Sequence, residues 1–252
     1  MSSPCDTCHA GCCRAFVVPL TGSDVLRLER TGLDFWDFAV RWSDPNGEIA
    51  RRHAPHLFFA DTGEEPFVLG LMQSESETLP GSTRCRFLRE SRPTADAPLG
   101  QAACSLYGSR PATCRVYPMR FESDRELVQL EMVPPHGRSG DDHPAYTLCP
   151  RPWSVDDVDA VEMPATIAAA EHEMRLFHKI VAVWNRRPGE WTAFPDFLRQ
   201  VYASLVRPAQ PLAAAAPVAA ADAPTQTIPF RRPERPVVET PTAAVQSPRR
   251  AA

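Results

Sequence analysis

Eight cysteines constrain this chain more than any other feature of its sequence. The last of them is Cys149, in a chain of 252 residues. In a reducing compartment, thiols in such number are more often metal ligands than disulfide partners, although disulfides and unlinked thiols stay open as alternatives. Thiolates are soft ligands that select zinc, copper(I) or iron–sulfur clusters over magnesium and calcium. The sequence therefore predicts a metal site built from sulfur.

Four cysteines open the chain in the spacing C-x2-C-x3-C-C, namely Cys5, Cys8, Cys12 and Cys13. On a helix the first three would share one face, and Cys13 would point roughly 100° away. A tight loop around Gly11 would also bring the sulfurs together. Burial of small hydrophobic side chains does not explain two adjacent cysteines so close to a terminus.

A second stretch, from Cys104 to Pro118, reads CSLYGSRPATCRVYP. Its prolines, glycine and arginines are typical of a bent loop that holds two thiols, rather than of a helix or strand. Arg110 and Arg115 lie close to the second thiol, and Arg14 follows the N-terminal cysteines. Positive side chains near a thiolate centre offset its negative charge and tune its potential. Arg110 and Arg115 are therefore predicted to contact the cofactor, and the alternative is that they are surface residues or partners of carboxylates.

The remaining two cysteines are Cys85 and Cys149, and the latter precedes a proline. The spacing of the eight matches neither a zinc ribbon nor a ferredoxin, so zinc and an iron–sulfur cluster both stay open. Eight thiols form either two four-ligand sites or one site with thiols left over. His9, between two of the cysteines, is a further candidate ligand.

Apolar periodicity and turn residues predict an α+β fold, in which helices pack on one side of a small antiparallel sheet. The expected helices cover residues 21–32, 34–42, 165–185 and 194–206, and the expected strands cover 66–73, 83–88 and 126–133. A capping pair, Ser154 and Asp157, predicts another helix start, with an interruption at Pro164. We expect the cysteines to gather at one end of the sheet, with at least six sulfurs in one place.

Composition divides the chain into a folded domain, 1–206, and a tail, 207–252. The tail holds nine prolines and a net charge of +3, and such a composition predicts disorder. Its RRPERP element, 231–236, is a candidate docking segment for a protein partner.

Bulk charge and hydropathy bear on partners and location. The net charge of −4 does not suggest a nucleic-acid partner. No stretch approaches the roughly 18 apolar residues of a membrane span, so we expect no membrane contact. The N-terminus lacks the pattern of a secretory signal, and we expect a cytosolic location.

Three motifs together resemble a known family: the N-terminal C-x2-C-x3-C-C, then C-R-F-L from Cys85, then C-S-L-Y-x-x-R-P-x-x-C-R-x-Y-P from Cys104. They are similar to the YkgJ-type cysteine-cluster family, described as a zinc- or iron-chelating domain or an Fe–S-cluster protein. The resemblance covers roughly residues 5–150. This chain departs from the family in having three residues, not two, before the paired cysteines, and a long gap of 18 residues between Cys85 and Cys104.

The resemblance implies metal ligation by all eight cysteines, least securely for the last: Cys5, Cys8, Cys12, Cys13, Cys85, Cys104, Cys114 and Cys149. The first hypothesis is therefore a cytosolic protein that holds zinc or an iron–sulfur cluster, with a redox or sensing role. The family also includes flagellin lysine N-methylases, which implies an S-adenosylmethionine-dependent enzyme as an alternative. A third hypothesis is an interaction protein with a zinc staple and a docking tail.

Overall fold

The computed structural model describes residues 5, 8–50, 54–124, 127–132, 143–149 and 153–206. These residues form an α+β structure of helices and small antiparallel sheets, as the sequence predicts. The tail that the sequence predicts to be disordered, 207–252, lies outside the described residues.

Six α-helices lie in the described residues: α1 (Cys12–Ala15), α2 (Gly22–Glu29), α3 (Phe35–Phe38), α4 (Ala112–Val116), α5 (Glu162–Trp184) and α6 (Phe194–Val206). Four short 3-10 helices accompany them: η1 (Tyr107–Ser109), η2 (Pro144–Tyr146), η3 (Val155–Asp157) and η4 (Trp191–Ala193). None of the helices in this part of the chain has the length and apolar character needed to cross a bilayer.

The described strands pair into four separate antiparallel ribbons. The pairs are β1 (Ala39–Ser43) with β2 (Phe67–Leu71), β3 (Gln73–Glu75) with β4 (Thr83–Cys85), β5 (Leu88–Glu90) with β6 (Ala102–Cys104), and β7 (Met119–Asp124) with β8 (Leu127–Met132). The expected strands are present, but the single sheet expected from them is wrong. The 83–88 segment is not continuous: β4 ends at Cys85, and β5 then pairs with β6.

Local capping signals explain the helix that was predicted over 21–32. Thr21 is its N-cap, and the capping box is reciprocal: the Asp24 amide donates to Thr21 Oγ1 at 3.1 Å, and the Thr21 amide donates to Asp24 Oδ2 at 2.9 Å. The helix ends before Gly32, whose φ of 91° a residue with a Cβ rarely adopts.

The helix predicted over 34–42 is wrong beyond its first turn. α3 spans only Phe35–Phe38, and Ala39–Ser43 continue as β1. Pairing of Val40 with Gly70 and of Trp42 with Val68 supplies backbone hydrogen bonds that the local sequence does not reveal. Long-range strand pairing therefore overrides the helical pattern here.

The C-terminal helices agree with the prediction: α6 has the predicted bounds, and α5 starts earlier than predicted. α5 begins at Glu162, so Pro164 lies in its first turn and does not interrupt it. The Ser154 amide and hydroxyl both donate to Asp157, at 2.7 and 3.0 Å, but this pair caps only the short η3 turn.

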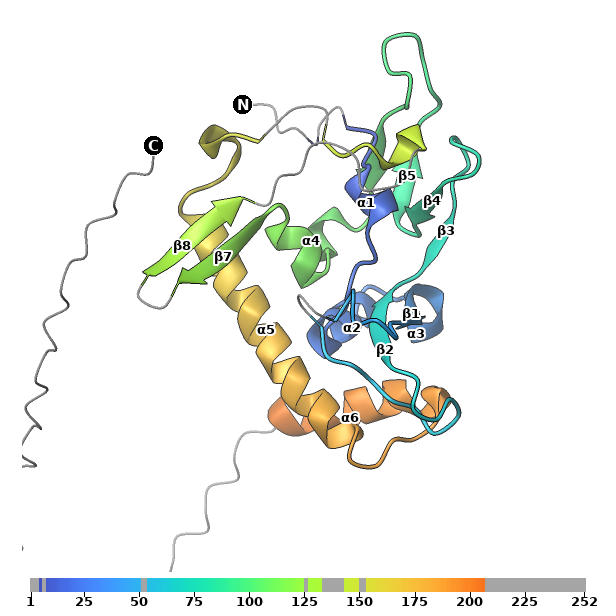
Figure 1. Ribbon diagram of the computed structural model, residues 1–252, viewed down its shortest axis with the longest axis vertical. Helices are drawn as coiled ribbons and strands as arrows, with labels where there is room; N and C mark the ends of the chain where they lie inside the picture. The colour runs from blue at the N-terminus through green and yellow to red at the C-terminus, as the bar shows by residue number, and fades with distance from the viewer. Residues whose placement is uncertain are drawn as a thin grey trace, which may run out of the picture. The chain divides into compact units, whose positions relative to one another are not determined.

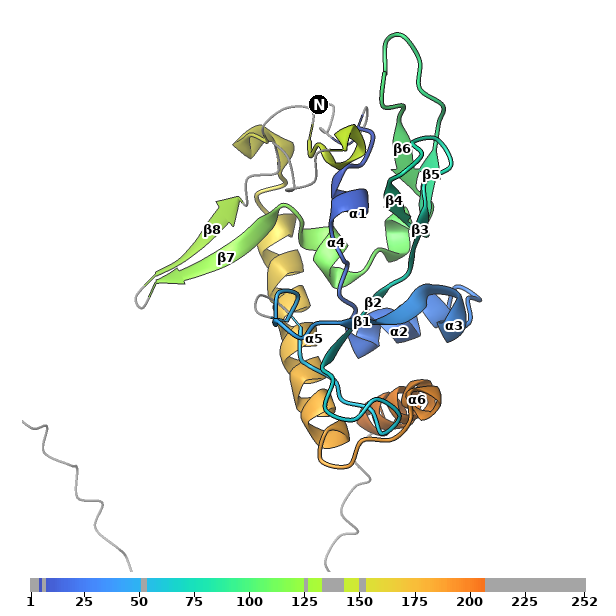
Figure 2. The same cartoon turned by 45° about the vertical axis from the view of Figure 1, so that its right-hand side comes forward.

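The hydrophobic core gathers residues of α2, α3, β1, β2, α5 and α6. At its centre the ring of Trp184 lies 6.0 Å from that of Phe59 and 5.0 Å from that of Phe194. Figures 1 and 2 both show α6 at one end of the molecule, and α1, α4 and β4, which carry cysteines, toward the other. The described residues 73–84 and 89–110 contribute no hydrophobic side chain to the buried core. These two stretches of the cysteine-bearing end therefore depend on other interactions for their cohesion.

Candidate metal centre

The eight cysteines come from six short segments of this end of the molecule, and none forms a disulfide. Cys5 and Cys8 precede α1, Cys12 and Cys13 begin α1, Cys85 ends β4, Cys104 ends β6, Cys114 lies in α4, and Cys149 follows η2. Cys114 corrects one detail of the predicted loop from Cys104 to Pro118, because a short helix carries that thiol.

Three thiols near the N-terminus and the thiol of Cys149 form a first group. Burial raises the pKa of Cys8, and the thiols of Cys149 and Cys5 raise it further. The neighbouring Cys13 thiol and burial raise the pKa of Cys12, and Cys8 and Cys149 add to that effect. We call Cys5, Cys8, Cys12 and Cys149 set A.

The other four thiols form a second group. Burial raises the pKa of Cys85 to about 12, and Cys13 and Cys104 contribute to the rise. Burial also raises the pKa of Cys114, with Cys13, Cys85 and Cys104 as its nearest thiols. We call Cys13, Cys85, Cys104 and Cys114 set B.

The two sets meet at α1. The sulfurs of Cys12 and Cys13 lie 4.0 Å apart, yet Cys12 neighbours the thiols of set A and Cys13 those of set B. Successive side chains on a helix point about 100° apart, so adjacent cysteines in α1 serve different neighbourhoods. Among the described residues no three His, Cys, Asp or Glu side chains surround one point closely enough to hold an ion as they stand. Metal binding would have to draw the sulfurs of a set closer together.

Backbone amides point at three of the sulfurs with the same offset of two residues. The Ala10 amide donates to Cys8 Sγ at 3.2 Å. The amides of Phe87 and Leu106, at the same offset from Cys85 and Cys104, oppose the rise in the pKa of those two thiols. Such N–H···S contacts stabilise a thiolate and orient it as a ligand.

Ala10 adopts a backbone conformation that non-glycine residues rarely adopt. Its φ is 59°, and Ala10 is the only non-glycine residue with a positive φ in the described part of the chain. This conformation costs roughly 1–2 kcal/mol. Strained backbone of this kind is typical of functional sites, and here it accompanies the amide's contact with Cys8.

An indole donates to a fourth sulfur. Trp153 Nε1 lies 3.3 Å from Cys149 Sγ. Nothing in the spacing of the cysteines points to Trp153, and its position four residues after a ligand cysteine is the one sequence signal for it.

Ribbon pairing places two thiols of set B side by side. Cys104 pairs with Leu88 in the β5–β6 ribbon, just after the turn that follows Cys85. The Ser105 amide and hydroxyl both donate to the Phe87 carbonyl, at 2.9 and 3.0 Å. The two turns that present Cys85 and Cys104 are therefore joined directly.

A buried carboxylate holds the helix of Cys114. Asp24 accepts a hydrogen bond from the Ala112 amide at 2.9 Å and pairs with Arg27. Burial raises the pKa of Asp24, and hydrogen bonds from Thr21 and Ala112 oppose the rise. The same carboxylate caps α2, so it ties α4 to the hydrophobic core.

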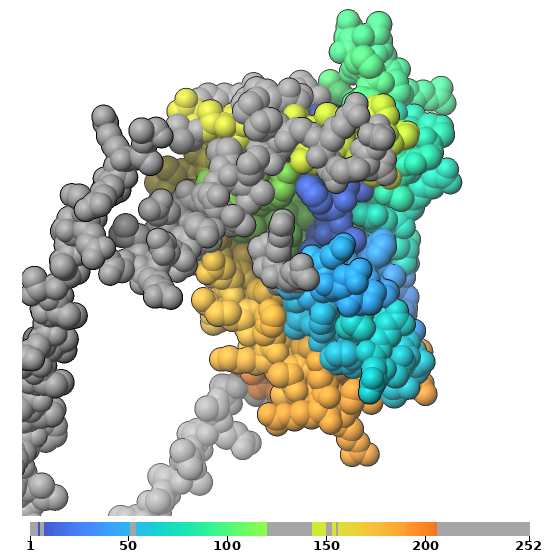
Figure 3. Space-filling model, viewed as in Figure 1, coloured from blue at the N-terminus to red at the C-terminus, as the bar shows by residue number. Residues whose placement is uncertain are grey.

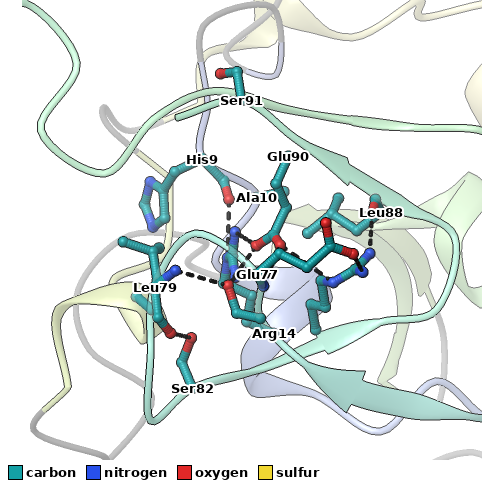
Figure 4. A network of polar contacts seen from close by, with 12 residues as sticks. His9, Ala10, Arg14, Glu77, Leu79, Ser82, Leu88, Glu90 and Ser91 are labelled. Atoms are coloured by element: carbon teal, nitrogen blue, oxygen red, sulfur yellow. Dashed lines mark hydrogen bonds and ion pairs between the residues drawn. The ribbon is translucent and has the colours of Figure 1, made fainter. Parts of the chain in front are cut away.

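A buried ion pair fixes α1 against the ribbons (Figure 4). The Arg14 guanidinium lies 2.5 Å from Glu90, and the two side chains are 1% and 3% exposed. Arg14 also donates to Ser76 Oγ at 3.1 Å and to the His9 carbonyl at 3.2 Å. Its main partner is therefore Glu90, a residue of a distant strand that no pattern near Arg14 in the sequence points to.

Arg110 and Arg115, the two arginines predicted to contact the cofactor, lie in different surroundings. The pKa of Cys13 is lowered, first by the Cys12 thiol and then by the charges of Arg110 and Arg14. Arg110 stacks on the Tyr107 ring at 3.9 Å. Arg115 lies 3.6 Å from Glu173 of α5. The structure thus brings Arg110 to the thiols and places Arg115 at a carboxylate, and cofactor contact by either arginine stays a prediction.

Close backbone packing brings Cys149 to set A. A Cβ on Gly11 would lie 1.8 Å from the Thr147 carbonyl oxygen, so only glycine fits. The Thr83 amide donates to the Tyr146 hydroxyl at 3.0 Å, which anchors the same segment to β4. In Figure 3 this yellow-green segment lies directly against the blue N-terminal part of the chain.

His9 is buried beside the same segment. Burial lowers its pKa, and the Thr147 and Ala145 carbonyls partly oppose that shift. A neutral imidazole is the form that binds metal, so its candidacy as a ninth ligand is compatible with this environment.

The donor set fits a soft metal. Burial raises the pKa of most of these thiols, so they are protonated at neutral pH until a cation displaces the protons. The N–H donors and Arg110 supply the polar and positive groups that thiolates require once they are charged.

Comparisons with known proteins agree with this chemistry. No curated protein and no solved structure matches the chain. Residues 4–133 match the model of the family CxxCxxCC, described as "Putative zinc- or iron-chelating domain". The match covers seven of the eight cysteines and more than half of the chain. The chain therefore belongs to the CxxCxxCC family of zinc- or iron-chelating domains.

Proposed function

We propose that this protein binds metal at two adjacent centres, each made of four cysteine thiolates. Set A and set B provide the ligands. The proposal is carried by the way the thiols act on one another's pKa, which divides them into two groups of four that meet at the Cys12 and Cys13 sulfurs, 4.0 Å apart. The N–H···S contacts at Cys8 and Cys149 support it, because they prepare sulfurs for a charged state.

The first role we propose for the metal is structural. Set A would join the N-terminus to the segment that ends at Cys149, and set B would join α1, β4, β6 and α4. The segment that ends at Cys149 buries Ala145, Tyr146 and Leu148, whereas residues 73–84 and 89–110, which include β6, bury no hydrophobic side chain. In such a region the free energy of metal binding contributes directly to folding.

Two kinds of metal fit four thiolates, and they imply different activities. Zinc would give a closed, redox-inert structural site. An iron–sulfur cluster would add a redox or sensing role, which the N–H···S donors and the charge of Arg110 near Cys13 favour, because such groups tune a cluster's potential. A reducing, cytosolic setting would keep the thiols available for either.

The other two hypotheses have less support. The lysine-methylase alternative rests on the resemblance alone, because no observation in the described residues bears on S-adenosylmethionine. Calorimetric titration with that compound tests it. The docking role of the tail concerns residues outside the described ones and stays a prediction.

Anaerobic purification of the full chain, followed by metal and acid-labile sulfide analysis and an absorption spectrum, tests the proposed function. Two zinc ions per chain without sulfide would establish the structural reading. Iron and sulfide with visible absorption would establish the cluster reading. A folded chain that carries no metal and takes up neither zinc nor iron would refute both.

A further inference from the structure

Tyr117 has a buried hydroxyl beside the thiols. Tyr117 directly follows α4, and its ring lies 6.2 Å from that of Phe16, which directly follows α1. Tyr117 therefore packs against the end of the helix that carries Cys12 and Cys13. Its Oη atom is buried and, among the residues that the structure describes, has no hydrogen-bond partner.

A buried hydroxyl without a partner is unfavourable, by roughly 1–3 kcal/mol. Two of the other tyrosines avoid this cost, because the Tyr146 hydroxyl accepts from the Thr83 amide at 3.0 Å and Tyr107 is 64% exposed. The buried Tyr202 hydroxyl shares the lack of a partner among the described residues, but burial and neighbouring carboxylates raise its pKa and no thiol contributes. The environment of Tyr117 thus lacks an acceptor in the metal-free protein.

Four thiols act electrostatically on the buried Tyr117 hydroxyl. Burial raises its pKa well above the ordinary value, and the thiols of Cys12, Cys149, Cys5 and Cys13 raise it further. The first three of these thiols belong to set A. A neutral thiol is a weak acceptor, whereas a thiolate accepts a charge-assisted hydrogen bond.

We infer that Tyr117 is a positioning residue for set A, whose hydroxyl donates a hydrogen bond to a thiolate sulfur when metal is bound. The inference rests on the proposed function. Metal binding releases the thiol protons to solvent, and the tyrosine keeps its own proton. The buried hydroxyl thereby gains, in the metal-bound state, the acceptor that it lacks without metal.

The inference predicts opposite effects of Tyr117→Phe in the two states. Without metal, loss of an unpaired hydroxyl leaves the stability unchanged or raises it. With metal, loss of a donor to a ligand sulfur weakens affinity at set A by about 10- to 100-fold. Affinity at set B stays at the wild-type value.

Competition titration of the reduced full chain with Zn²⁺ and a chromophoric chelator measures these affinities, and Co²⁺ charge-transfer absorption reports the sulfur environment. Tyr107→Phe, at an exposed tyrosine, is the matched control and should titrate like the wild type. Tyr146→Phe shows the effect of losing a hydroxyl that is purely structural. This variant should lower the stability of the metal-free protein, which Tyr117→Phe should not do.

Each outcome decides a distinct point. A wild-type chain that binds no Zn²⁺ or Co²⁺ refutes the proposed function itself. Wild-type binding together with an unchanged Tyr117→Phe titration overturns the role of Tyr117, and so does a less stable metal-free Tyr117→Phe protein. In a Cys8→Ser background, which removes a ligand of set A, the effect of Tyr117→Phe should disappear; its persistence would contradict an action through set A.

Discussion

At the scale of single residues, short contacts to sulfur prepare the site before any metal arrives. Ala10 adopts a strained backbone conformation with a φ of 59°, and its amide nitrogen lies 3.2 Å from Cys8 Sγ. Phe87 and Leu106 present their amides to Cys85 and Cys104 in the same way. The turn after a ligand cysteine is therefore a repeated unit of this site.

Substitution of Ala10 tests the strain. Ala10→Gly should leave the stability unchanged or raise it by up to about 1 kcal/mol, because glycine tolerates positive φ but is more flexible when unfolded. Ala10→Val should destabilise by about 1–2 kcal/mol or more, because a β-branched residue fits this conformation poorly. Urea unfolding of the metal-loaded proteins measures both values, and equal midpoints for Val and Gly variants would argue against strain at this turn.

The Arg14–Glu90 pair makes a second prediction at this scale. Because both side chains are almost fully buried, removal of Glu90 leaves the Arg14 guanidinium without a carboxylate and should cost about 3–5 kcal/mol. Removal of Arg14 should cost less, because Arg84 lies 3.2 Å from Glu90 and still pairs with it. Glu90→Gln should lower the urea midpoint strongly and Arg14→Met should lower it less, and the double variant should lose much less than the sum of the two. Strict additivity would show that the two side chains do not act as a pair.

At the scale of elements, close packing decides which thiols meet. Gly11 lets the Thr147 carbonyl approach α1, and this contact brings Cys149 to set A. Gly11→Ala should therefore displace residues 143–149 and remove the metal of set A while set B keeps its own. Metal analysis of the purified variant measures this. Gly108→Ala, where a Cβ meets no atom within 4 Å, is the control and should keep both metals; a Gly11→Ala protein with full metal content would contradict the packing argument.

The elements also show what the sequence can predict. The helix that starts after Thr21 follows from local capping, and α5 and α6 follow from apolar periodicity. The partners of the strands do not follow from periodicity, since β1 needs β2 and β5 needs β6 from elsewhere in the chain. For that reason the helix predicted over 34–42 and the single predicted sheet were both wrong.

At the scale of the whole molecule, the structure has two differently stabilised ends. One end packs aromatic and aliphatic side chains around Trp184 and Phe194. The other gathers eight thiols from six segments, and its residues 73–84 and 89–110 bury no hydrophobic side chain. Metal binding would stabilise the fold at the second end, as hydrophobic burial stabilises it at the first.

The ligand residues were predictable at this scale, but their division was not. Soft thiolates in such number point to metal from the sequence alone. Which four belong together depends on the direction of Cys12 and Cys13 from α1 and on the approach of Cys149, and both are tertiary facts. The partners Glu90, Asp24 and Trp153 are equally invisible in the spacing of the cysteines.

Metal content per folded chain of four proteins tests the account most directly: the wild type, Cys8→Ser, Cys104→Ser and the double variant. Cys8 belongs to set A and Cys104 to set B. Two separate centres predict that each single variant loses one centre and keeps the other with unchanged spectroscopic properties, and that the double variant loses both. Loss of all metal from either single variant while the chain stays folded, or no loss from either, would contradict two centres of four cysteines.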